Sequence, residues 1–144
     1  MMYVGIKHLH SFMGYVVLLG ILFSIIYALV SYFKNKPYNK KIAAIGLGVT
    51  HFQIVMGLIL YFISPWGMKS LNGAAMKDAL LRLFTVEHPL IMILATVLIT
   101  IGFSKAKRLK DDKVQNRTIL VFYSIGLILI LSRIPWMFWP VSSY

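Results

Sequence analysis

Four apolar runs, each close to the length of a membrane-spanning helix, constrain this chain more than any other feature. They cover residues 5–33, 42–63, 86–104 and 118–139. A helix needs about 20 apolar residues to cross the hydrocarbon core of a bilayer, and a soluble domain of this size could not cover so much apolar surface. We therefore predict an all-α integral membrane protein, a four-helix up-and-down bundle that forms a single domain over residues 1–144 within the lipid bilayer.

The composition agrees with a membrane location and narrows the chemistry. The chain has 144 residues, of which 59% are hydrophobic and 13% are charged, and it contains no cysteine. Without cysteine, disulfides, thiolate metal sites and covalently attached c-type haem are excluded. The net charge of +11 could suggest nucleic acid, but the basic residues gather at the ends of the apolar runs. Since that is the pattern of membrane topology, we expect no nucleic-acid partner.

Two run boundaries carry further expectations. The first run is too long for the apolar core of a signal peptide, and no small-residue cleavage site follows it, so we expect a retained helix. Pro89 suits the first turn of the third helix, where its missing N–H is not needed. We expect the fourth helix to close at Pro140.

The distribution of charge predicts the orientation of the bundle. Residues 34–41 hold four lysines and no acid, and residues 105–117 hold six basic residues and two acids. Residues 64–85, between the second and third runs, hold only three basic residues. The first and third loops share one side of a four-helix chain, and the more basic loops of membrane proteins are cytoplasmic. We therefore predict that both termini lie outside, on the periplasmic side of a bacterial inner membrane.

The second loop is not simply polar. Between residues 73 and 84, apolar Met76, Leu80, Leu81 and Phe84 recur near helical spacing, with charged residues between them. This pattern favours a short amphipathic helix lying in the outer membrane interface. An ordinary surface turn of helix is the open alternative.

All four histidines lie inside or at the mouths of the apolar runs. An ionisable side chain at membrane depth is costly and usually marks a site, and imidazole is a standard ligand of haem iron. At a rise of about 1.5 Å per residue, His51 lies near the midplane, whereas His88 and Arg133 share a level in the outer half, with His10 close above. The first and third helices of such a bundle are diagonal, so His10 and His88 can face each other, and His51 would face the fourth helix.

These depths predict one haem b in the outer half of the membrane. His10 and His88 are the preferred axial ligands of the iron, and His51 is the competing ligand. Arg133 or Lys7 could pair with the haem propionates on the outer side, and the charge of Arg133 inside an apolar helix needs such a partner. Candidate walls of the pocket are the bulky side chains near these levels, Phe12, Tyr15, Phe52 and Met92.

Each of these features also has a simpler explanation. His8 is expected to be a hydrogen-bonded group at the interface, His88 could cap the third helix, and His51 could bond to another helix. Gly14, one turn after His10, could make room for a flat macrocycle or only let two helices approach closely. The chain has four acids and none lies in the middle of an apolar run, which argues against a carboxylate-based proton pump or cation transporter.

Five short motifs together resemble a known family. They are His-Leu-His-Ser (8–11), Thr-His-Phe-Gln (50–53), Gly-Leu-Ile-Leu-Tyr-Phe (57–62), Val-Glu-His (86–88) and Arg-Ile-Pro-Trp (133–136). The chain resembles a small bacterial four-helix membrane family labelled cytochrome b-like. It is more distantly similar to the four-helix halves of haem A synthase and to b-type dihaem membrane cytochromes. The resemblance implies that His10, His51 and His88 match haem ligands. The histidines do not form two pairs at two depths, which favours at most one haem.

Together these features predict a b-type cytochrome or a haem-handling protein. It would pass electrons between a quinol, or a partner protein of a respiratory or other membrane complex, and an acceptor on the outer side. We expect an electron carrier or a subunit rather than a stand-alone enzyme. Two other classes stay open: a haem-free structural subunit of a larger membrane complex, and a bundle that binds a lipid or a quinone.

Overall fold

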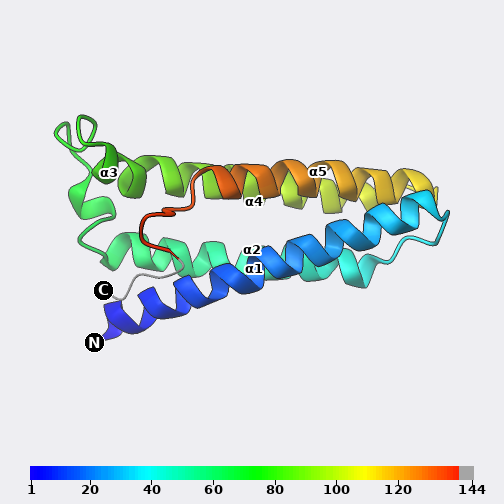
Figure 1. Ribbon diagram of the computed structural model, residues 1–144, viewed down its shortest axis with the longest axis horizontal. Helices are drawn as coiled ribbons and strands as arrows, with labels where there is room; N and C mark the ends of the chain where they lie inside the picture. Colours follow the sequence, from blue (N-terminus) through cyan, green and yellow to red (C-terminus); the bar gives the residue numbers. More distant parts are fainter. Residues whose placement is uncertain (140–144) are drawn as a thin grey trace.

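The computed structural model describes residues 1–139, and these residues form helices, turns and loops without any strand (Figure 1). Four helical segments are long and apolar enough to cross a membrane. They are α1 (Met2–Phe33), α2 (Lys40–Ile63), a third segment built from α3 (Ala79–Arg82), η2 (Leu83–Glu87) and α4 (His88–Ala106), and α5 (Asp112–Ser132). The predicted all-α, four-helix membrane bundle is confirmed, and its apolar outer surface contacts lipid.

The helices run up and down, and each packs against two neighbours. The neighbouring pairs are α1 with α2, α2 with α4, α4 with α5, and α5 with α1. The α1–α2 and α4–α5 loops lie together at one end, which we call the inner end (Figure 1). The N-terminus and the α2–α3 connection lie at the opposite, outer end. Because α1 and α4 are diagonal in this order, the predicted arrangement of the first and third helices is confirmed.

Small residues let α4 and α5 approach closely. A Cβ atom built on Gly126 would lie 2.6 Å from Ile99 Cγ1, and one on Gly102 would overlap the Phe122 side chain. Ile99 is fully buried at this contact. Because neither position has room for a methyl group, the glycines set the distance between the two helices.

Hydrogen bonds between helices reinforce α1, α2 and α5 in the inner half. The Ser24 hydroxyl donates to the Ile42 carbonyl at 2.8 Å, and the buried Tyr123 hydroxyl donates to the Ala43 carbonyl at 2.6 Å. Gly46 makes room for both side chains, because its Cβ would lie 2.9 Å from Ser24 Oγ and from Tyr123 Cε2. These contacts give polar groups the partners that hydrocarbon cannot provide.

The two inner loops are tied to each other. The Tyr38 backbone N–H donates to the Asp112 carboxylate at 2.8 Å, and the Asn116 side-chain amide donates to the Lys36 carbonyl at 3.2 Å. Asn116 is almost fully buried. Burial also raises the pKa of the Tyr38 hydroxyl above its ordinary value. The loops therefore form one folded end rather than two independent turns.

We predicted that the third membrane helix begins at residue 86, but it begins earlier. The short helix predicted within residues 73–84 is present as α3, but it starts at Ala79 and runs without a break through η2 into α4. Asp78 starts it, because its carboxylate accepts the backbone N–H groups of Leu80 and Leu81 at 2.9 Å each. Upstream, the second loop holds only the 3-10 helix η1 (Met68–Ser70) within the described residues.

The fourth membrane helix is displaced from the predicted range of 118–139. It begins at Asp112, after the Asp111 carboxylate accepts the Val114 N–H at 2.8 Å, and it ends at Ser132. The predicted ending was wrong because of Pro135, which disfavours helical geometry at the residue before it. Residues 133–139 instead leave α5 and cross the outer end toward α1 (Figure 1). Pro140, the predicted stop, lies outside the described residues.

Candidate functional site

A proline explains the irregular helix beside His88. In a regular helix the N–H of residue 89 would donate to the Thr85 carbonyl, but Pro89 has no N–H and its ring crowds that carbonyl. The chain widens into the π-helical turn η2 just before it, and the Tyr61 hydroxyl of α2 donates to the Thr85 carbonyl at 3.0 Å. Pro89 therefore stands in the first turn of α4, as predicted, although α4 continues a helical segment that already starts at Ala79.

The structure brings His10 of α1 and His88 of α4 together across the bundle. Their ring centroids are 6.3 Å apart and their ring planes are inclined by 83°. His88 Nδ1 donates to the Arg133 backbone carbonyl at 2.8 Å. Because a carbonyl only accepts, Nδ1 carries the proton and Nε2 keeps a lone pair. His88 is the first residue of α4, but its side chain does not cap that helix, since Nδ1 bonds to the Arg133 carbonyl instead.

His10 is held against α2 but is not fully satisfied. A Cβ on Gly57 would lie 3.1 Å from His10 Cε1, and the Gln53 amide donates to the His10 backbone carbonyl at 2.9 Å. His10 Nδ1 and Gln53 Oε1 are both buried and have no hydrogen-bond partner within residues 1–139. Buried polar atoms are nearly always paired, so these two atoms mark the outer α1–α2 contact as incompletely hydrogen-bonded within the described residues.

The separation of the two rings matches two imidazoles on opposite sides of one metal ion. A metal–imidazole bond of about 2.0 Å, with the nitrogen roughly 1 Å from its ring centre, gives centroids roughly 6 Å apart. The 6.3 Å separation of the His10 and His88 centroids agrees with this value. Among the described residues no group of three or more His, Cys, Asp or Glu could hold a metal ion. The two imidazoles are therefore the metal-binding side chains that the described bundle brings closest to this arrangement.

The predicted pocket walls are only partly in place. Phe12 and Phe52 are 62% and 47% exposed on the surface of the bundle, so they do not line the space between the histidines. Tyr15 stacks on Trp139, with ring centroids 4.5 Å apart. Met92 packs against the buried core. The expectation was wrong for the two phenylalanines because they lie on the lipid-facing side of their helices.

The space beside Gly14 is filled by the chain itself. A Cβ on Gly14 would lie 3.2 Å from Trp139 Cζ2, and the Trp139 indole N–H donates to the Ser11 carbonyl at 2.9 Å. This glycine therefore lets the segment after α5 approach α1. Of the two explanations offered for Gly14, the structure supports close approach.

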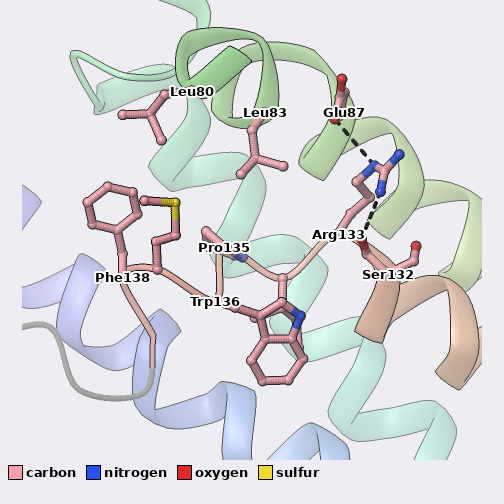
Figure 2. Close-up of a pocket in the computed structure, with 10 residues that line it drawn as sticks. Leu80, Leu83, Glu87, Ser132, Arg133, Pro135, Trp136 and Phe138 are labelled. Carbon is pink, nitrogen blue, oxygen red and sulfur yellow. Dashed lines mark hydrogen bonds and ion pairs between the residues drawn. The ribbon is translucent and has the colours of Figure 1, made fainter.

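Arg133 lies at the end of α5 rather than inside an apolar helix as predicted. Its Nε is 3.3 Å from one Glu87 carboxylate oxygen, and Arg82 Nε is 2.8 Å from the other (Figure 2 draws the Arg133 contact). Both ion pairs are partly exposed, and together the three groups carry one net positive charge. Glu87 therefore supplies the partner that the sequence argument sought in a propionate.

A cavity of about 270 Å³ lies beside this ion-pair cluster at the outer end (Figure 2). Its lining is mostly apolar and comes from α3, η2, the end of α5 and the segment after α5. The main lining residues are Leu80, Leu83, Glu87, Arg133, Trp136 and Phe138. The Arg133–Glu87 ion pair forms part of the wall of this cavity.

His51 does not join the histidine pair. It is exposed on α2, and its Nε2 lies 3.0 Å from the Thr100 hydroxyl of α4. The prediction that it faces the fourth helix was wrong because of helical phase. Gly46 and Thr50 turn into the core, and His51 lies about 100° further round the helix. His8 is exposed near the start of α1, where an interfacial group was expected.

Gln53, Tyr61 and Thr100 take part in these contacts, although the histidine pattern alone does not reveal them. Gln53 could have been found as the only amide side chain in the run 42–63. Tyr61 could not, because its role depends on the carbonyl that Pro89 leaves without a donor.

No family model matches the chain, and no curated protein or solved structure matches it either.

Proposed function

We propose that this chain is an integral membrane b-type haem protein in which His10 and His88 bind one haem iron from opposite sides. The observation that carries the proposal is the ring pair itself, with centroids 6.3 Å apart on diagonal helices. The hydrogen bond from His88 Nδ1 to the Arg133 carbonyl supports the proposal. Such a bond places the proton on Nδ1 and leaves the Nε2 lone pair available to a metal.

The residues around the pair would orient the ligands and balance charge. Gly57 leaves room for the His10 ring against α2, and the Arg133 carbonyl orients His88. Arg82 and Arg133 share Glu87, and the remaining positive charge at the outer end suits anionic propionates. A haem iron with two histidine ligands supplies one-electron transfer.

We further propose that the protein lies in a bacterial inner membrane with both termini periplasmic. The inner end of the bundle carries ten basic residues and two acids, whereas the rest of the chain carries five and two. The likeness of the motifs to the cytochrome b-like family supports the same location. One haem in the outer half would serve an electron carrier or a subunit, which exchanges electrons with a quinol or with a partner protein of a membrane complex.

Optical spectroscopy of the purified protein tests this proposal. A dithionite-reduced minus oxidised spectrum should show a Soret band and an α-band, either as purified or after addition of haemin. His10→Ala and His88→Ala should each lose the low-spin spectrum, and His51→Ala, the matched control, should keep it. If wild-type protein shows no Soret band even with added haemin, the proposal is wrong.

A haem-free structural subunit of a larger membrane complex is the second candidate. It is favoured by the way the outer end closes on itself, since Trp139 fills the space beside Gly14 and Glu87 pairs with Arg133. Co-purification with a partner in fixed stoichiometry, together with no chromophore after addition of haemin, would support this candidate instead.

A further inference from the structure

His51 has one ring nitrogen that the bundle leaves open. The Thr100 hydroxyl has a single proton and donates it to the Thr96 carbonyl at 2.7 Å. The Thr100 oxygen must therefore accept from His51 Nε2, 3.0 Å away. In this tautomer His51 Nδ1 carries a lone pair, and it has no hydrogen-bond partner within residues 1–139.

The depth of His51 in the membrane restricts which groups can donate a hydrogen bond to its Nδ1. His51 is the twelfth of the 24 residues of α2. It therefore lies about 17 Å from either end of the helix, at the centre of the bilayer. The side chain is exposed on the outside of the bundle, where hydrocarbon offers no donor. Since lipid headgroups stay at the interfaces, the missing donor must belong to a molecule dissolved in the hydrocarbon or to another helix.

A gap lies one turn away on the same helix. Gly48 is exposed, and no atom lies within 4 Å of the position that its Cβ would occupy. The core glycines differ, since the Cβ positions of Gly20 and Gly46 are filled by neighbouring side chains. Gly48 thus packs against no neighbouring helix within the described residues, and it leaves open surface one turn away from a hydrogen-bond acceptor.

We propose that His51 and the open surface at Gly48 form a binding site for a lipid-soluble hydroquinone. A ring hydroxyl of the hydroquinone donates to His51 Nδ1, and the ring lies against Gly48 and the exposed Phe52. The apolar tail stays in the surrounding lipid. A quinone carbonyl can only accept, so the site prefers the reduced form of the ring. The site gives a position to the quinol that the proposed function names as an electron partner, but binding at His51 Nδ1 does not require bound haem.

Three matched probes test the proposal on the whole protein in lipid nanodiscs. They are a decyl-tailed dimethoxy-methyl hydroquinone under anaerobic conditions, the corresponding quinone, and the bis-methyl ether of the hydroquinone, which has no donor. The hydroquinone should bind about tenfold more tightly than the other two, the effect of one net hydrogen bond. His51→Phe should remove this preference for the hydroquinone. Gly48→Leu should weaken the binding of all three probes.

Equal affinity of wild-type protein for the three probes would overturn the proposal. So would a preference for the hydroquinone that persists in a folded His51→Phe variant. Efficient cross-linking through Gly48→Cys to a second copy or to a foreign helix, with no effect of added hydroquinone, would show that another helix supplies the donor. The probes are measured on haem-free protein, so this test and the Soret test fail independently.

Discussion

The inner and outer halves of the bundle are built on different principles. In the inner half, helices meet at glycines, and hydroxyls such as that of Tyr123 bond across helices. In the outer half, Pro89 and Pro135 each deprive a carbonyl of its helical donor. The side chains of Tyr61 and Trp136 replace these donors, at 3.0 Å in both cases. The inner half gains stability from regular packing, whereas the outer half gives up regular bonding near the histidine pair.

Breaking the inner half should produce the largest effect. Gly102→Leu forces a side chain into Phe122, and overpacking of this kind should lower the free energy of unfolding by about 3 kcal/mol. Gly48→Leu is the matched control, because its position is open, and it should leave stability nearly unchanged. Unfolding in mixed micelles, followed by circular dichroism, measures both. Similar losses in the two variants would contradict the contrast between packed and open glycines.

A single bond in the inner half should have a smaller effect. Tyr123→Phe removes the donor to the Ala43 carbonyl and should cost about 1 kcal/mol, within the range of interhelical hydrogen bonds in membranes. Tyr27→Phe is the control, because the Tyr27 hydroxyl has no hydrogen bond in the described part of the chain. The same unfolding assay compares them, and a Tyr27→Phe loss as large as that of Tyr123→Phe would count against the account.

The corresponding bond in the outer half should depend on the proline. Tyr61→Phe should cost about 0.6 kcal/mol, because the Thr85 carbonyl then loses its donor. In the Pro89→Ala background a backbone N–H at position 89 can supply that donor, so the same change should cost almost nothing. A double-mutant cycle of unfolding free energies measures this coupling. Additive effects would show that Tyr61 does not compensate for Pro89.

The inner loops should add a small sensitivity to alkaline pH. Burial raises the pKa of Tyr38 above its ordinary value of 10.0, so the folded state favours the neutral phenol. Its contribution to stability is complete below about pH 10 and is lost as the pH rises through the raised pKa. Tyr38→Phe should therefore reduce the fall in stability over this range. An unchanged slope of unfolding free energy against pH would contradict the role given to its burial.

Much of the fold could be predicted from the sequence, because run length and loop charge are averages over many residues. The facing of His10 and His88 could also be predicted, since it needed only their depths and the order of the helices. The ends of the third and fourth helices could not. Tyr61 on α2 provides the donor that lets the third helix pass through Pro89, and no local pattern contains that contact.

The candidate site was predicted less completely than the fold. Depth alone did not give helical phase, so His51 was assigned to the wrong neighbour although its level was right. Arg133 was read as a charge inside an apolar helix because the end of α5 was placed too late. Its partner Glu87 comes from a different helix. In each case the missing information was the direction of a side chain rather than its position along the chain.

Low-temperature electron paramagnetic resonance of the oxidised, haem-loaded protein tests most directly whether His10 and His88 share one iron. Two imidazole ligands with nearly perpendicular planes, as the 83° inclination indicates, should give one low-spin ferric species with a strongly anisotropic signal. The signal should be lost in both His10→Ala and His88→Ala and kept in His51→Ala. A high-spin signal in wild-type protein, or a low-spin signal that survives His10→Ala and disappears in His51→Ala, would contradict the pairing.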